Sequence, residues 1–309
     1  KRRKMTQASL TVSSDFSQTL KKLAGQVDDA LQKWLPQPMP EVSAKLNEAM
    51  RYSALAGGKR IRPVLCLLVA EAAGLHSEAA LRAGCAYELI HTYSLIHDDL
   101  PAMDNDDFRR GRPTNHKVYG EATAILAGDG LLTMAFGWLA ELAGCGVTTE
   151  KIVKIIALAA EAAGHAGMVG GQMLDIAWEK QRAELPVLES IHRQKTGALI
   201  RAPILTGAIL AGLADSHCKI LDLYSGRIGL LFQIVDDILD VVGDAKSLGK
   251  TTGRDAVLEK STYPSLLGLD GARDYAARVH AEAVALVAQL PLTFSCLKEM
   301  ADIIFFRKN

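Results

Sequence analysis

Apolar residues recur three and four positions apart along almost the whole chain, whereas alternating runs of Val, Ile and Thr are nearly absent. This spacing is the period of amphipathic helices and not of strands. The breaks between the expected helices are short and fall at Pro or Gly, as at 36–40 and 57–58. None is long enough to be a flexible linker between domains. The pattern predicts an all-α protein.

We expect residues 1–10 to form a flexible tail and residues 11–309 to form a single domain. With 309 residues, 49% of them apolar, the chain can bury a substantial core. The basic run at 1–4 is interpreted as foreign to the natural chain, which would then start at Met5. The polar stretch that follows Met5 has no hydrophobic segment of the kind that a secretory signal requires.

Charge and cysteine usage narrow the class of protein. Lys+Arg and Asp+Glu both number 35, so no net field favours nucleic acid or an anionic membrane as a partner. The five cysteines are widely spaced and form no C-x-x-C pair, which argues against a zinc site or a redox dithiol. We therefore expect a cytoplasmic protein. No uninterrupted apolar run approaches the roughly 18 residues that a membrane span needs, so we expect a soluble protein.

The most informative helix carries an acidic stripe. Gln233, Asp236, Asp237 and Asp240 lie at i, i+3, i+4 and i+7, and nearly every other position from 230 to 242 is apolar. The alternative, an ordinary solvated helix face, is usually broader and mixes charges. Because unpaired buried carboxylates are very costly, this stripe indicates a cation site.

A second acidic cluster lies at Asp98, Asp99 and Asp104. Pro101 disfavours helical geometry at the residue before it, so the helix is expected to end near Asp99 and the chain to fold back toward Asp104. Carboxylates that are completed by water and substrate phosphates are typical of Mg²⁺ sites. An apolar cavity beside such a site favours a phosphorylated ligand with an apolar body, namely a prenyl diphosphate.

Basic residues adjoin both regions. After Gly57 and Gly58, the residues Lys59, Arg60 and Arg62 are expected at a helix N-terminus, where the backbone already favours an anion. The alternative is a solvated basic turn. The charged run from 106 to 112 is either a salt-bridged loop or part of a site for a metal-bridged diphosphate.

Together these motifs resemble the trans-type isoprenyl diphosphate synthases, and most closely the bacterial short-chain farnesyl diphosphate synthases. The likeness covers nearly the whole chain from about residue 15 and rests on the segments 57–63, 91–110, 170–172, 195–197, 232–240 and 249–264. Asn105 stands where near relatives often have Asp. The resemblance implies the isoprenoid synthase fold, a bundle of roughly ten or more mostly antiparallel helices around a central cavity, and a homodimer.

The resemblance also implies a role for each site residue. Three Mg²⁺ ions, for which Mn²⁺ is an expected substitute, would be held by Asp98, Asp104 and Asp236, supported by Asp99, Asp237 and Asp240. The allylic diphosphate would be bound by Arg109, Lys195, Lys250 and Lys260. The diphosphate of isopentenyl diphosphate would be bound by Lys59, Arg62, His91 and Arg110. Thr196 and Gln233 would face the developing carbocation, with Gln172 and Asp175 as supporting residues.

The expected reaction is the Mg²⁺-dependent head-to-tail condensation of isopentenyl diphosphate with dimethylallyl and then geranyl diphosphate. Tyr93, beside Ser94, would be the floor that stops the product at the fifteen carbons of (2E,6E)-farnesyl diphosphate. Ordinary packing of a core Tyr is the alternative. Within the family, geranylgeranyl diphosphate synthase and geranyl diphosphate synthase remain alternative functions. A terpene cyclase needs no second diphosphate site, so it would have no use for the basic residues Lys59, Arg62, His91 and Arg110. A non-catalytic binding subunit should have lost some of the metal ligands, and this chain has lost none.

Overall fold

The computed structural model of the chain describes residues 14–40, 43–242 and 261–307. These residues are almost entirely helical, which confirms the predicted all-α class. The helices are α1 (Ser14–Trp34), α2 (Ala44–Ala54), α3 (Ile61–Ala72), α4 (Glu78–Asp98), α5 (Asn115–Tyr119), α6 (Glu121–Ala140), α7 (Thr149–Ala163), α8 (Met168–Ala177), α9 (Leu185–His192), α10 (Ala198–Ala211), α11 (Asp215–Val242), α14 (Tyr263–Val287) and α15 (Ser295–Phe306). Short turns η1 (Glu141–Cys145) and η3 (Leu292–Phe294) are 3₁₀-helical, and η2 (Arg193–Gly197) is π-helical.

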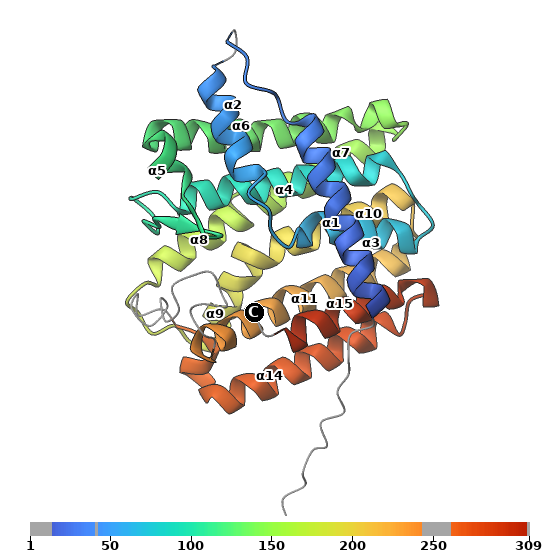
Figure 1. Cartoon of the computed structure of the whole chain (residues 1–309). Coiled ribbons are helices and arrows are strands. Elements are labelled where there is room, and N and C mark those ends of the chain that lie inside the picture. The colour runs from blue at the N-terminus through green and yellow to red at the C-terminus, as the bar shows by residue number, and fades with distance from the viewer. Residues whose placement is uncertain (1–13, 41–42, 243–260, 308–309) are drawn as a thin grey trace, which may run out of the picture.

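The helices stack in layers around α4. In Figure 1, α4 crosses the middle of the molecule, with α2 and α6 on one side and α11, α14 and α15 on the other. α4 packs against α6, α3 and α10, while α11 packs against α10 and α14. The two helices that carry the acidic clusters therefore lie in neighbouring layers, both in contact with α10.

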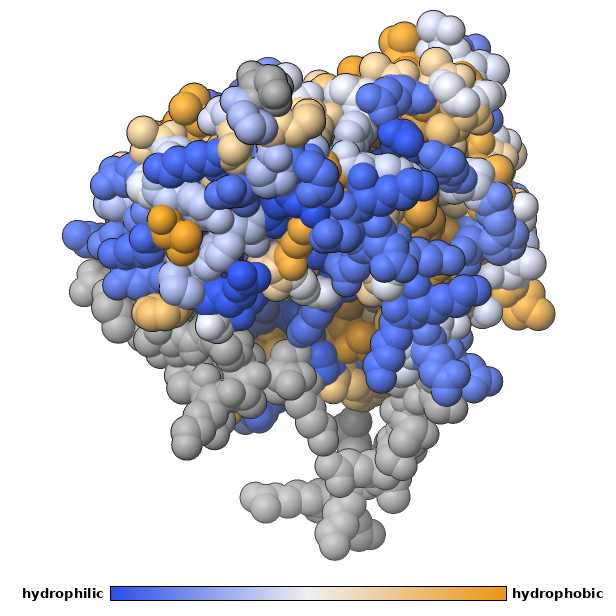
Figure 2. Space-filling view, turned by 45° about the horizontal axis from the view of Figure 1, so that its top comes forward, coloured by the Kyte–Doolittle hydropathy of each residue, from blue (hydrophilic) through white to orange (hydrophobic). Residues whose placement is uncertain are grey.

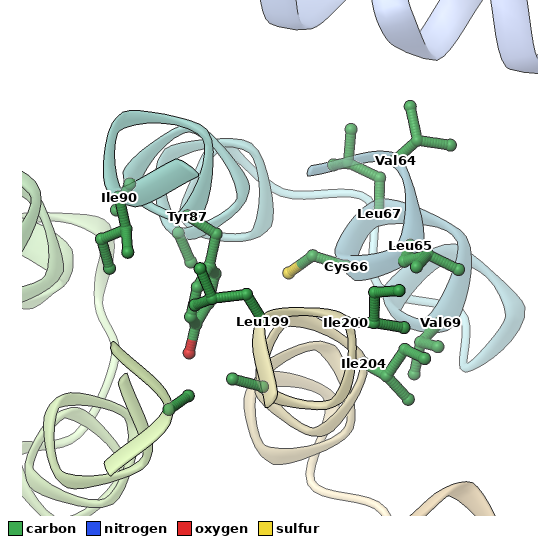
Figure 3. Close-up of a cluster of buried hydrophobic side chains, with 14 of the residues drawn as sticks. Val64, Leu65, Cys66, Leu67, Val69, Tyr87, Ile90, Leu199, Ile200 and Ile204 are labelled. Atoms are coloured by element: carbon green, nitrogen blue, oxygen red, sulfur yellow. The ribbon is translucent and has the colours of Figure 1, made fainter. Parts of the chain in front are cut away.

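The core between α3, α4 and α10 is apolar with one buried polar pair. Figure 3 shows side chains from these helices pointing toward one another, among them Cys66, Tyr87 and Ile204. The Tyr87 hydroxyl lies 2.7 Å from Thr206 Oγ1, so neither buried hydroxyl lacks a partner. At Gly207 an added Cβ would lie 2.6 Å from the Cys66 carbonyl oxygen, which shows how closely α10 approaches α3.

One small feature departs from the helical pattern. β1 (Phe108–Arg109) pairs antiparallel with β2 (Arg112–Pro113). The turn between them uses left-handed backbone at Arg110, with φ of 53°, and at Gly111, with φ of 72°. This hairpin presents Arg109 and Arg110 next to the end of α4, where both belong to the predicted site.

Two stretches, Glu121–Cys145 and Thr149–Ala177, are long and apolar enough to cross a membrane by length and composition. The expectation concerned uninterrupted apolar runs, and both stretches are interrupted by charged residues such as Asp129 and Lys154. The second stretch is not one straight helix, because the chain leaves the helix at Gly164 and re-enters it at Met168. Within the molecule, 39% of the most apolar part of each stretch is buried.

Candidate active site

The acidic end of α4 folds back on itself as predicted. Asp98 is the last residue of the helix and Asp99 is its C-cap. The chain then turns so that the Asp104 N–H donates to the Asp98 carbonyl oxygen at 2.8 Å, and the Asp106 N–H donates to the Asp99 carbonyl oxygen at 3.1 Å. Asp98 and Asp104 are thereby brought together across a break in the helix, which a continuous helix would not do.

The Asp98 carboxylate lies in an environment that opposes its charge. Burial raises its pKa to about 6, an effect that Lys195 counteracts and that Asp104 reinforces. A buried carboxylate beside a second carboxylate gains most from a nearby cation. Lys195 thus lies near Asp98 and Asp104 although it is far from both in the sequence.

Lys195 and Thr196 lie on the π-helical turn η2, which packs against α8 and α11. The Lys195 Nζ atom lies 2.7 Å from Asp175 Oδ2 on α8. The supporting role of Asp175 in the site remains a prediction. An added Cβ at Gly171 would meet the Lys195 backbone nitrogen at 2.1 Å. Glycine is required there because α8 touches the turn directly. Short π-helical turns are frequent at functional sites.

Arg109 and Asp99 are bound to each other. Arg109 Nη2 lies 2.6 Å from Asp99 Oδ1, and its Nε lies 2.8 Å and 3.0 Å from the two carboxylate oxygens. Burial raises the pKa of Asp99, and the hydrogen bonds from Arg109 oppose that shift. Asp99 therefore fixes the Arg109 fork at the end of α4, a role that the spacing of the acidic cluster did not reveal.

The acidic stripe on α11 places its carboxylates in different surroundings. Asp236 is exposed, and its Oδ1 lies 3.1 Å from Arg307 Nη2. Asp237 is buried, and its Oδ2 accepts a hydrogen bond from the Tyr263 N–H at 3.0 Å, in the first turn of α14. Asp240 is half-buried one turn further along. Asp236 is thus the member of the stripe placed for a diffusible cation, and the metal roles of all three remain predictions.

The basic set expected for isopentenyl diphosphate assembles beside α4. Lys59 is exposed, and Arg62 is the second residue of α3. Arg110 Nη1 donates to the Gly57 carbonyl oxygen. Burial lowers the pKa of His91 well below its ordinary value, and Arg62 and Arg110 add to this shift. His91 is therefore neutral at physiological pH and lies among cations.

Arg60 lies at the N-terminus of α3 as expected, as its N-cap. The expectation that its side chain takes part in an anion site with Lys59 and Arg62 was wrong. Its guanidinium is fully buried and bonds to Glu88 Oε1 at 2.7 Å and Asp28 Oδ1 at 2.8 Å. The signal that could have revealed this is Glu88 itself, a lone carboxylate in the otherwise apolar run around 85–90 of α4. Such a residue requires a buried partner.

The remaining predicted residues lie around the same region. Tyr93 is buried on α4 and packs edge-on against His97, with ring centroids 5.6 Å apart. The Ser94 hydroxyl donates to the His91 carbonyl oxygen at 2.9 Å, within the helix. Gln233 lies on α11, which contacts the η2 turn of Thr196. Lys250 and Lys260 lie outside the described residues.

In the described part of the chain, the candidate ligands for divalent cations are single carboxylates and not a cluster of side chains. Within 14–40, 43–242 and 261–307, no three His, Cys, Asp or Glu side chains are grouped closely enough to hold a metal by themselves. Single carboxylates such as Asp98 are the candidate donors. Gln172 Oε1 is buried and has no hydrogen-bond partner in that part of the chain. Mg²⁺ is commonly held in this way, by one or two carboxylates with waters and substrate phosphates.

Hydrophilic residues gather around a hollow in Figure 2, and hydrophobic residues are visible in its depth. A cleft at the end of α4 is lined by Asp99, Arg109, Arg110 and Thr92 among others, and not by Asp98, Asp104 or Asp236.

Comparison with known proteins agrees with this chemistry. Residues 43–287 match the family model described as polyprenyl synthetase. The chain is 48% identical over 265 residues to farnesyl diphosphate synthase of Bacillus subtilis, covering 85% of this chain and 89% of that protein. It is also 48% identical over 266 residues to a chloroplastic geranylgeranyl pyrophosphate synthase of Capsicum annuum, covering 85% and 72%.

Two solved structures share the fold. An FPP/GFPP synthase from Zymomonas mobilis superposes with a TM-score of 0.84 at 37% identity, covering 94% of this chain and 99% of that one. A Helicobacter pylori geranyltransferase complexed with magnesium and isoprenyl diphosphate gives 0.82 at 33% identity, covering 95% and 97%. The resemblance deduced from the motifs is confirmed. The chain belongs to the polyprenyl synthetase family and is a short-chain trans-prenyl diphosphate synthase, a prenyltransferase of a Mg²⁺-dependent family.

Proposed function

We propose that this protein is a farnesyl diphosphate synthase that condenses isopentenyl diphosphate first with dimethylallyl and then with geranyl diphosphate. The observation that carries the C15 product is the position of Tyr93, buried on α4 five residues before Asp98. Its ring packs edge-on against His97, which limits the orientations of the ring. A fixed aromatic at this depth limits the length of the growing chain.

The allylic diphosphate would lie between the two acidic clusters. Asp98, Asp104 and Asp236 would hold Mg²⁺, which when bound stabilises the charge of the departing diphosphate. Arg109, oriented by Asp99, and Lys195, oriented by Asp175, supply fixed positive charge from two other segments. Preorganised cations of this kind act where charge develops, without reorganising during the reaction.

Isopentenyl diphosphate would bind at the basic set formed by Lys59, Arg62, His91 and Arg110. Burial lowers the pKa of Arg62 to about 10, an effect that Glu88 opposes and Arg110 reinforces. An anion between Arg62 and Arg110 relieves their mutual repulsion. His91, being neutral, would donate a hydrogen bond from its ring N–H and not a full charge.

The chain's remaining groups would serve the cationic stage of the reaction. Loss of the allylic diphosphate leaves a carbocation toward which Thr196 and Gln233 would turn oxygen atoms. The double bond of isopentenyl diphosphate attacks this cation, and the released diphosphate takes the proton that is then lost. Apolar walls around Tyr93 exclude water, which would otherwise capture the cation.

We also infer a homodimer and a cytoplasmic location. Exposed apolar side chains lie on α5, α6 and α7, with Val118 at 46%, Ile125 at 44%, Leu126 at 57% and Val153 at 60% exposure. Where such side chains gather into a patch, they mark protein interfaces. Substituting Leu126→Glu should shift the mass in light scattering from dimer to monomer. A wild-type monomer would contradict the dimer.

Product analysis tests the proposal. The protein is incubated with labelled isopentenyl diphosphate and either dimethylallyl or geranyl diphosphate, with Mg²⁺ or with a chelator, and the products are separated by length. A Mg²⁺-dependent C15 diphosphate from both starters supports farnesyl synthesis. A C20 product would assign geranylgeranyl synthesis instead, and a C10 product that is not extended would assign geranyl synthesis.

A further inference from the structure

The buried guanidinium of Arg60 joins four helices at one point. Its Nε atom lies 2.8 Å from Asp28 Oδ1 on α1, and its Nη1 atom lies 2.7 Å from Glu88 Oε1 on α4. Its Nη2 atom donates to the carbonyl oxygen of Ala54 at 2.8 Å, the last residue of α2. Arg60 itself is the N-cap of α3. All three arms of the guanidinium fork therefore have a partner.

The backbone of Arg60 is unusual as well. Its φ is 47° and its ψ is 36°, in the left-handed region that residues with a Cβ rarely adopt. Such a conformation persists when the surrounding structure determines it. The side-chain contacts of Arg60 hold its backbone in this conformation, because each contact fixes where the chain enters α3. Lys59 precedes this residue directly and Arg62 follows two positions later, so the conformation of Arg60 sets where both cations lie.

Arg60 also governs the charge around the basic set. Glu88 is buried, with 2% exposure, and it lies one turn before His91 on α4. The negative charge of Glu88 raises the pKa of Arg62 and of Arg110, whereas burial lowers both. Because the shortest contact of Glu88 is with Arg60, its negative charge is neutralised there. Without Arg60, Glu88 would be an anionic competitor for the cations that hold the substrate.

We propose that Arg60 is a positioning residue for isopentenyl diphosphate, which fixes the turn carrying Lys59 and Arg62 and keeps Glu88 from pairing with the substrate-binding cations. The inference rests on the proposed function, since it assumes that this basic set binds the second substrate. Arg60 acts through these neighbours and does not touch substrate.

The test separates positioning from simple stability. Arg60→Met leaves Glu88 buried without its partner and is expected to lower the unfolding temperature. The double variant Arg60→Met/Glu88→Met removes both charges, so stability should return. In the double variant, the KM for isopentenyl diphosphate should remain raised about tenfold or more, because the turn has lost its anchor. The KM for the allylic substrate and kcat should stay within about twofold of wild type.

Two further variants complete the set. Arg60→Lys keeps the charge without the three-armed fork, so it should give a KM for isopentenyl diphosphate between those of wild type and Arg60→Met. Arg82→Met is the control, because Arg82 lies on the same helix α4 as Glu88 but pairs with Glu78 and Glu141. It should change stability without changing either KM.

A refolded double variant with a wild-type KM for isopentenyl diphosphate would overturn the inference, and so would an equal rise of both KM values. Absence of condensation by the wild-type protein would instead refute the proposed function. The two failures are therefore distinguishable.

Discussion

Arg109 and Asp99 form a buried two-pronged ion pair at the end of α4, with Arg109 Nη2 2.6 Å from Asp99 Oδ1. The family resemblance implied different ligands for these residues, metal for Asp99 and diphosphate for Arg109. In the structure Asp99 holds Arg109 in place. The hairpin that carries Arg109 is thereby tied to the helix that carries Asp98.

Neutralising Asp99 should therefore impair binding of the allylic substrate through Arg109. Asp99→Asn keeps the shape of the side chain but removes the charge that orients the guanidinium. We expect the free energy of unfolding to fall by about 1–3 kcal/mol, the usual cost of losing hydrogen bonds to a charged group. The kcat/KM for the allylic substrate should fall about tenfold. Urea denaturation and steady-state kinetics measure both, and an unchanged allylic kcat/KM would contradict the role.

The sequence predicted the helical class, the ends of the helices at Gly57 and Pro101 and the two acidic clusters, because each depends on local chemistry. It did not distinguish which charges face the cavity. Lys59, Arg60 and Arg62 look alike in the sequence, yet only Arg60 is paired with Asp28 and Glu88, which lie on helices distant in the chain. Asp236 and Asp237 are likewise adjacent, and only packing against α14 separates their surroundings.

Shortening Tyr93 should lengthen the product. Tyr93→Ala removes the buried ring that packs against His97, so the pocket below Asp98 deepens. Chromatography of the dephosphorylated products should show C20 and longer chains where wild type stops at C15. Tyr93→Phe keeps the ring and should retain the wild-type length. Unchanged C15 product from Tyr93→Ala would remove Tyr93 as the floor.

The neutral His91 predicts a loss of stability in acid. Burial, with the nearby Arg62 and Arg110, holds the pKa of His91 well below that of the unfolded chain, about 6.5. The unfolded state therefore takes up a proton that the folded state does not. The contribution of His91 is complete above pH 6.5 and is lost as the pH falls below it, by up to about 1.4 kcal/mol for each pH unit.

Denaturation at pH 7.5 and pH 5.5 checks this sign. His91→Gln lacks the titrating group, so it should lose less stability than wild type between the two pH values. Equal losses in both proteins would show that His91 is protonated in the folded state.

Arg307 should compete with metal for Asp236. Arg307 Nη2 lies 3.1 Å from Asp236 Oδ1, and its guanidinium lies 4.2 Å from the centre of the Phe232 ring. Because a cation already occupies this carboxylate, Arg307→Met should strengthen Mn²⁺ binding to the substrate-free protein about two- to fivefold, as for a partly exposed ion pair. Electron paramagnetic resonance of free Mn²⁺ measures this. Arg307→Lys retains the charge and should match wild type, and unaltered binding by Arg307→Met would exclude the competition.

The most direct test of the account is the activity of Asp98→Asn and Asp236→Asn at saturating Mg²⁺, with the unfolding temperature measured in parallel. Burial raises the pKa of Asp98 to about 6, so neutralising it should leave the metal-free fold as stable as wild type or more so. Asp107→Asn, a change at an exposed carboxylate paired with Lys117, serves as the control. Both site variants should lose at least about 100-fold in turnover while remaining folded, and the control should keep its rate. Near-wild-type turnover by either folded site variant would contradict a condensation site built on the two acidic clusters.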